Sequence, residues 1–145
     1  MTVTVNAGDG YTISSTAGSG LVSVADNDDG TPPNLPSVSI AGNVVTESAP
    51  FSLLEFRLTL SQASDENITV YYETREGTAQ NHLDYQGTSS GRAVIYAGRT
   101  SGAIIVNVRD DHRVEQDETF ELVLRRADGA VIADGKTTGT IKDND

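Results

Sequence analysis

Acidic residues are concentrated in one short stretch of the second half of the chain. Residues 108–124 read VRDDHRVEQDETFELVL. Five of the nine residues from 110 to 118 are acids, namely Asp110, Asp111, Glu115, Asp117 and Glu118. Carboxylates gathered in a loop are the oxygen ligands that Ca²⁺ prefers. The alternative for such a cluster is a solvated acidic turn that keeps a β-protein soluble.

Glu118 differs from the other acids because of the apolar residues that follow it. It has the same parity as the apolar positions of the alternating run 120–124, and a period of two is typical of a half-buried strand. Glu118 is therefore predicted to point toward the core face at the mouth of its strand, where an unpaired carboxylate is costly. The nearest bases, Arg109 and Arg113, cannot balance five acids, whereas a divalent cation could.

The bulk composition excludes several classes of protein. The net charge of −11 makes nucleic acid and anionic lipid poor partners. The chain has no Cys, so disulfides and thiolate metal sites are absent. No apolar run approaches the roughly 18 residues of a membrane helix. Met1 is followed by neither a basic start nor an apolar stretch, so no signal peptide is expected, and an exported protein would be represented here by an internal fragment.

Alternating β-patterns separated by Gly, Pro and Asp-rich turns run through most of the chain after residue 36. They predict an all-β fold, an immunoglobulin-like antiparallel β-sandwich of about seven strands. No amphipathic helix is expected. The predicted strands are 38–45, 51–60, 67–74, 92–96, 103–108, 118–125 and 137–142.

The chain also contains an internal repeat. LVSVADND at residues 21–28 and TGTIKDND at residues 138–145 are β-runs that end in the same Asp-Asn-Asp, 117 residues apart. Residues 1–29 are therefore predicted to be the C-terminal strands of an upstream repeat, paired as a hairpin on the module or with a neighbouring chain. The Pro-rich residues 30–36 are predicted to be a linker, and 37–145 one whole module.

Other chemistries fit the sequence poorly. The run that begins at Asp26 has Ser37 at the twelfth position, where an EF-hand needs Glu. His82 and His112 are the only His residues and are expected in exposed loops, so a zinc site is not predicted. No nucleophile motif is visible, and the chain has no Trp to stack a sugar at paired carboxylates. An enzyme is therefore not expected.

Several short motifs resemble the Calx-beta domain family over about residues 37–145. This family occurs in the cytoplasmic regulatory region of sodium–calcium exchangers and as repeats in extracellular adhesins. The motifs are VTE at 45–47, LTLS at 58–61, VYYET at 70–74, GTA at 77–79, DY at 84–85, DD at 110–111, VEQDETFEL at 114–122 and GTIKDND at 139–145.

The resemblance implies a calcium site in the loops at one end of the sandwich. The positions that match family ligands are Glu47, Asp84, Asp110, Asp111, the backbone carbonyl of Arg113, Glu115, Glu118, Asp143 and Asp145. Two departures from the family pattern are expected to lower the number of ions or their affinity. Asn144 interrupts the terminal acids, and His112 with Arg113 adds basic groups to the acidic loop.

The function predicted from these observations is a Ca²⁺-binding repeat module of a cell-surface or secreted multi-domain protein, in which Ca²⁺ stiffens the loops and the joint to the next module. The expected partners are calcium ions, neighbouring modules and an extracellular protein or carbohydrate ligand. Two alternatives stay open. One is a metal-free structural or adhesive spacer, and the other is a cytoplasmic calcium-sensing domain of an exchanger.

Overall fold

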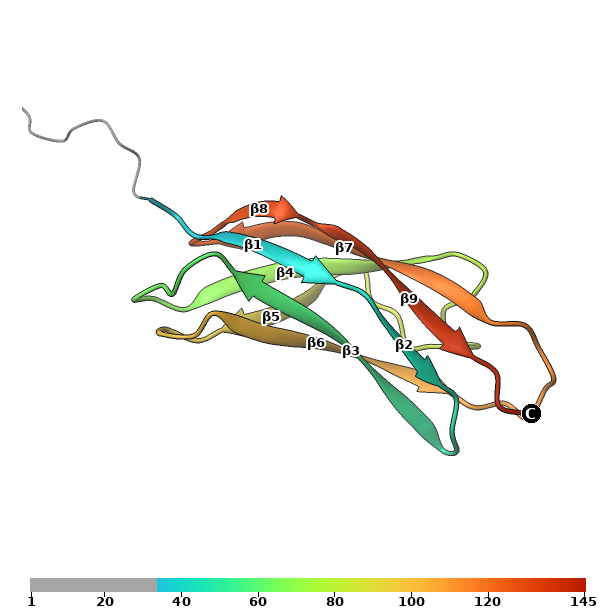
Figure 1. The fold of residues 1–145 in the computed structure, drawn as a ribbon. Coiled ribbons are helices and arrows are strands. Elements are labelled where there is room, and N and C mark those ends of the chain that lie inside the picture. Colours follow the sequence, from blue (N-terminus) through green and yellow to red (C-terminus); the bar gives the residue numbers. More distant parts are fainter. Residues whose placement is uncertain (1–33) are drawn as a thin grey trace, which may run out of the picture. The chain divides into compact units, whose positions relative to one another are not determined.

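Nine β-strands form residues 34–145, the part of the chain that this computed structural model describes (Figure 1). The all-β prediction is confirmed, although the strands number nine and not about seven. The described residues contain no helix that is long and apolar enough to cross a membrane. The strands are β1 Ser37–Ala41, β2 Asn43–Thr46, β3 Phe51–Leu60, β4 Ile68–Glu76, β5 Gly91–Ile95, β6 Ser101–Arg109, β7 Glu118–Asp128, β8 Val131–Asp134 and β9 Lys136–Lys142.

The strands form two sheets that face each other across one apolar core. One sheet has the order β6-β3-β1-β8 and the other β2-β9-β7-β4-β5. The alternation in the sequence decides which side chains enter the core. In β3, for example, Leu54, Phe56, Leu58 and Leu60 are at most 4% exposed, whereas the intervening Leu53, Glu55, Arg57 and Thr59 are exposed. A strand with this alternation, such as β3, buries its apolar face between the two sheets, as a sandwich requires.

The predicted strand 38–45 is two strands that belong to different sheets. β1 pairs with β3, whereas β2 pairs in parallel with β9. Gly42 lies between them, and a Cβ atom at this position would collide with the carbonyl oxygen of Thr138 on β9. The absence of a side chain allows the chain to pass this close to β9 as it changes sheets.

The second missed strand is β8, a run of only four residues. It pairs in parallel with β1, so the sandwich has two parallel pairings besides its antiparallel ladders. Short runs next to Asp-Gly turns are poorly distinguished from loops by alternation.

The predictions for the start of the chain concern residues 1–36, of which the structure describes only 34–36. The upstream strands predicted for residues 1–29, with their hairpin, lie outside the described residues, as does most of the predicted linker 30–36. The proposed division of the chain therefore stays a prediction.

Candidate metal centre

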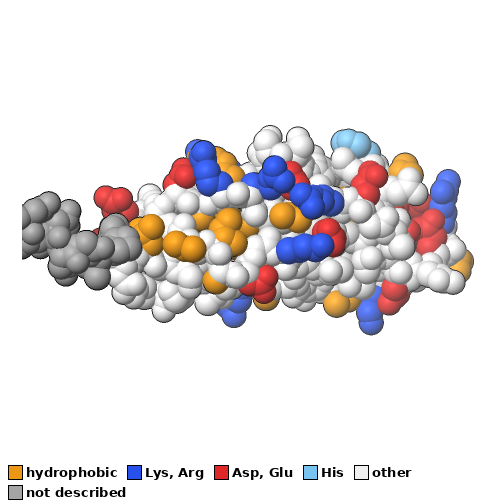
Figure 2. Space-filling view, turned by 90° about the horizontal axis from the view of Figure 1, so that it is seen from above, with side chains coloured by type: hydrophobic (Ala, Val, Ile, Leu, Met, Phe, Trp, Pro, Cys, Tyr) orange, Lys and Arg blue, Asp and Glu red, His pale blue; other side chains and the backbone are white. Residues whose placement is uncertain are grey.

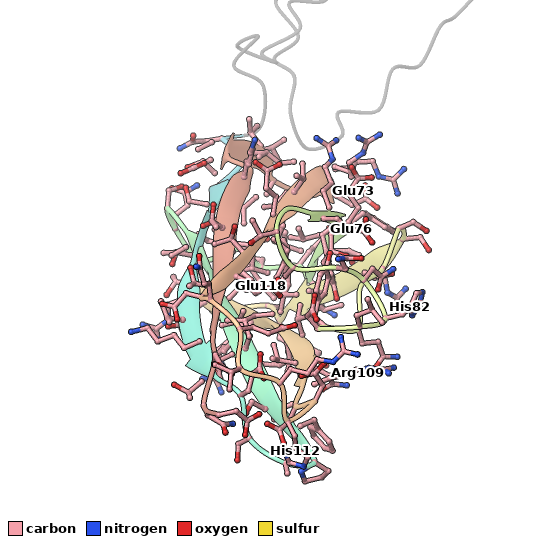
Figure 3. All side chains as sticks on the ribbon, turned by 90° about the vertical axis from the view of Figure 1, so that its right-hand side faces the viewer. Glu73, Glu76, His82, Arg109, His112 and Glu118 are labelled. Atoms are coloured by element: carbon pink, nitrogen blue, oxygen red, sulfur yellow. The ribbon has the colours of Figure 1, made fainter. Side chains whose placement is uncertain are left out.

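One end of the sandwich brings together segments that are far apart in the sequence. There β2 leads to Glu47, β6 leads into the loop 110–117, and β9 leads to the C-terminus at Asp145 (Figure 1). Figure 3 looks at this end, with Glu118 and His112 labelled. The acids gathered here are called the distal cluster: Glu47, Asp84, Asp110, Asp111, Glu115, Glu118, Asp143 and Asp145.

Asp84 is placed in the distal cluster by its neighbour Tyr85. The Tyr85 side chain is fully buried and stacks on Phe120 of β7, with ring centroids 4.0 Å apart and 11° between the planes. The Asp84 carbonyl accepts a hydrogen bond of 2.8 Å from the Arg109 N–H at the end of β6. The Asp84 carboxylate accepts one of 2.6 Å from the Gln80 N–H. These contacts fix Asp84 beside the start of β7.

Glu118 forms a group of three carboxylates with Asp84 and Glu115. One oxygen from each lies within 4.8 Å of the others. Glu118 lies on the same face of β7 as the buried Phe120, Leu122 and Leu124, so the inward orientation predicted from parity is confirmed. Its Oε2 atom is buried and has no hydrogen-bond partner among the described residues. A buried carboxylate oxygen without a partner is unfavourable, so the group favours a ligand there.

The electrostatics of Glu118 and Glu47 show how crowded the distal cluster is. Burial, the negative charge of Asp84 and a hydrogen bond with it raise the pKa of Glu118 to about 7, with smaller contributions from Glu115 and Glu47. Burial raises the pKa of Glu47 to about 7 as well, and the charges of Asp143 and Asp111 and then those of Asp110 and Glu115 add to it. Glu47 is only 8% exposed. Without a cation, these two carboxyls resist ionisation near neutral pH.

The C-terminal residues are tied to the rest of the distal cluster by hydrogen bonds. The Asn144 amide donates to the Glu47 carbonyl at 2.6 Å and to Asp110 Oδ1 at 3.0 Å. The Glu115 N–H donates to Asp143 Oδ2 at 3.0 Å. The sequence pointed to Asn144 only as a departure from an all-acid pattern. In the structure it joins the end of β2 to the acidic loop, a role that no sequence signal indicated.

The basic residues of the acidic loop contact the acids next to them. His112 Nδ1 lies 3.4 Å from Asp110 Oδ2 and 3.9 Å from Asp145 Oδ1, and these three side chains form a second group able to hold an ion. The His112 side chain is 75% exposed, as expected for a loop residue, but its contact with Asp110 was not predicted. The Arg113 N–H donates to Asp111 Oδ1 at 3.1 Å, and its Nε lies 3.5 Å from Asp111 Oδ2.

The predicted ligands therefore fall into two neighbouring sets. A cavity of about 320 Å³ is lined by one set, which comprises Asp84, Asp110, Asp111, Arg113, Glu115 and Glu118, together with Gln80, His82, Leu83 and Arg109. The other set, which does not line this cavity, consists of Glu47, Asp143 and Asp145. The charges of lining acids raise the Glu47 pKa, Asp143 accepts a hydrogen bond from Glu115, and Asp145 lies near Asp110. Asp110 belongs to both sets, because it lines the cavity and also bonds Asn144 of the C-terminal segment.

The donor atoms of the distal cluster suit a hard cation. Ca²⁺ takes six to eight oxygen ligands in flexible geometry, and carboxylates and loop carbonyls are the groups present here. The buried Glu118 Oε2, which has no hydrogen-bond partner among the described residues, is one oxygen that such a cation would satisfy. A single His among carboxylates does not provide the N and S donors of a zinc site. The residues fit Ca²⁺.

Comparison with known proteins agrees with this fold. The sequence model of the Calx-beta domain matches residues 38–145. The solved structure of the apo-form Calx CBD1 domain superimposes with a TM-score of 0.66 at 24% identity, covering 77% of this chain and 99% of that one. The CBD12 structure from CALX1.2 gives a TM-score of 0.65 at 25% identity over 75% of this chain and 46% of that chain. No curated protein sequence gives a significant match.

The chain belongs to the Calx-beta domain family, because the match covers well over half of its length. It has the fold of the Calx calcium-binding domains, one of which is described as the calcium binding domain CBD12 of CALX1.1. This chain covers 46% of the length of each CBD12 structure.

Proposed function

We propose that this module binds Ca²⁺ at the distal cluster and thereby fixes the loops at the C-terminal end of the sandwich. The observation that carries the proposal is the buried, unpartnered Oε2 of Glu118 next to Asp84 and Glu115. Bound Ca²⁺ supplies the positive charge that these carboxyls lack. Glu118 lies at the start of β7 and Asp84 is fixed beside it, whereas Glu115 and Asp143 belong to the acidic loop and the C-terminal segment, so a bound ion joins these two segments to the sheet.

The same arrangement supports a role in a repeat array. Asp143 and Asp145 lie at the end of β9 and lead toward whatever follows the module, so an ion bound near them stiffens a joint to a neighbouring module. The repeated Asp-Asn-Asp sequence supports an array of a cell-surface or secreted protein, with an extracellular protein or carbohydrate as its ligand. The calcium-sensing domain of an exchanger in the cytoplasm is the alternative setting.

Calorimetric titration of the apo-protein with Ca²⁺ tests the proposal. We expect measurable heat at millimolar Ca²⁺ or below, and a melting temperature that rises with Ca²⁺ and falls with EDTA. A hundredfold excess over the dissociation constant stabilises the fold by about 2.7 kcal/mol per independent site. The matched variants are Glu118→Gln, which removes a ligand charge, and Glu55→Gln on the exposed face of β3. No heat, together with an unchanged melting temperature in EDTA, contradicts the proposal.

A metal-free structural spacer is the second candidate, and contacts within the distal cluster favour it. Asn144 bonds both Glu47 and Asp110, and His112 lies beside Asp110, so part of the cluster is held together by the chain's own groups. A spacer of this kind gives identical melting curves in Ca²⁺ and in EDTA, which is the outcome that separates it from the first candidate.

A further inference from the structure

An open groove lies beside the distal cluster, on the outer face of the four-stranded sheet. Its volume is about 480 Å³, and its lining residues are Pro50, Phe51, Gln86, Asn107, Arg109 and Asp110. Phe51 on β3 is directly opposite Arg109 on β6. Gln86 comes from the segment that runs along β6, where its N–H donates to the Asn107 carbonyl at 2.8 Å. The groove is therefore built on paired strands.

The apolar part of the groove is the Phe51 ring. This side chain is 53% exposed, although Phe residues are among those most often found inside proteins. Pro50 precedes it and also lines the groove. An exposed aromatic ring with polar groups around it is a common mark of a binding surface, because the ring offers a flat apolar face at a small cost in conformational entropy.

The polar part of the groove combines fixed donors and acceptors. The Asn107 Nδ2 donates to Gln86 Oε1 at 3.1 Å, which orients both amides. Asn107 Oδ1 is left as an acceptor, and the Gln86 NH₂ is left as a donor. The Arg109 guanidinium, labelled in Figure 3, makes no ion pair and no side-chain hydrogen bond among the described residues, although it also lines the acidic cavity. Its fork of N–H donors is thus available to a ligand.

We propose that this groove binds a neutral saccharide. A sugar ring has an apolar face that can pack on Phe51, and its hydroxyls both donate and accept hydrogen bonds, as the side chains of Asn107, Gln86 and Arg109 require. An acidic ligand is disfavoured because Asp110 and the rest of the distal cluster repel it. Arg109 and Asp110 line both this groove and the acidic cavity, so titrations in chelator, where no Ca²⁺ is bound, test saccharide binding separately from the calcium function proposed above.

The experiment is a titration of the protein in EDTA with three neutral probes, maltotriose, cellotriose and triacetylchitotriose, and with trigalacturonic acid as the anionic probe. Saturation-transfer NMR detects contact, and calorimetry gives the affinity. The variants Phe51→Ala, Arg109→Gln and Asn107→Ala each remove one lining group. The controls are Leu53→Ala and Arg57→Gln, which alter exposed residues of the same strand outside the groove. Melting curves verify that every variant is folded.

We expect one of the neutral trisaccharides to bind. Since each variant removes about one hydrogen bond or one stacking contact, each should weaken binding about fivefold or more, while the controls stay within about twofold. Binding by none of the three neutral sugars overturns the proposal, as does tighter binding of trigalacturonic acid. Affinities that are unchanged in the groove variants, or lowered equally in the controls, also overturn it, because the sugar would then lie elsewhere.

Discussion

Replacing the partly buried carboxyl of Glu118 by an amide should have opposite effects on the apo-protein and on its response to Ca²⁺. The pKa of this carboxyl rises from 4.5 to about 7 in the folded protein. At about 1.4 kcal/mol per pKa unit, keeping it ionised at pH 8 costs the folded state about 3 kcal/mol. Because Glu118 is only partly buried and Asp84 shares the repulsion, Glu118→Gln should stabilise the metal-free fold by about 1–3 kcal/mol.

The sign of the pH dependence makes this prediction specific. A carboxyl whose pKa is raised on folding binds its proton more tightly in the folded state, so its ionisation destabilises the fold as the pH rises from about 4.5 to about 7. At pH 5 Glu118 is protonated in the folded protein and only a small part of this destabilisation is present, so the substitution should change stability much less than at pH 8. At pH 8 the melting temperature in EDTA should rise by about 4 °C or more.

Thermal unfolding in EDTA at pH 5 and pH 8 is the assay, with Glu55→Gln as the exposed control that should shift neither curve. Addition of Ca²⁺ should raise the melting temperature of the native sequence more than that of Glu118→Gln, because the variant lacks a ligand charge. A variant that is less stable than the native sequence in EDTA at pH 8 would refute the reasoning. An equal shift at both pH values would also refute it, since the effect would then come from packing and not from charge.

Three further predictions concern the same end of the sandwich and the connection between β1 and β2. Protons should compete with Ca²⁺ for Glu47 and Glu118, so affinity should fall about ten- to a hundredfold between pH 8 and pH 6 in calorimetric titrations; a constant affinity contradicts this. Asn144→Ala removes two hydrogen bonds and should lower the stability of the apo-protein by about 1–3 kcal/mol in urea unfolding, with exposed Asn43→Ala as the milder control. Gly42→Ala places a Cβ against the Thr138 carbonyl and should lower the free energy of unfolding by about 1–3 kcal/mol in the same assay. Native-like stability of this variant would contradict the close approach of Gly42 to β9.

The sequence predicts the acidic end of the sandwich better than it predicts the path of the chain toward it. Parity alone correctly placed Glu118 inward, because side-chain direction in a strand follows strictly from position. The division of 38–45 at Gly42 was missed, since Val38 to Val45 is rich in β-formers, and the change of sheet shows only in the different partners of the two halves, β3 for β1 and β9 for β2.

The hydrogen bonds within the distal cluster could not be predicted from the sequence for a different reason. The bonds from Asn144 to Glu47 and Asp110 join residues 97 and 34 positions apart, and such pairings depend on how β2, β6 and β9 end together. The unpartnered oxygen of Glu118 likewise depends on how the segments that carry Asp84, Glu115 and Glu118 meet, which no local pattern encodes. What the acids do as ligands stays a prediction for titration to decide.

The parallel pairing of β2 with β9 has a mechanical consequence. The described chain enters at one end of the sandwich and leaves at the other (Figure 1). Pulling the ends apart draws β1 and β2 in one direction and β9 in the opposite direction. The ladder from Asn43–Gly139 to Thr46–Lys142 is then sheared along its length, so its hydrogen bonds resist together and not one after another as in an unzipped hairpin. A module with this topology is suited to resist tension applied at its two ends, and the pairings of β1 with β3 and β8 share the load with this ladder.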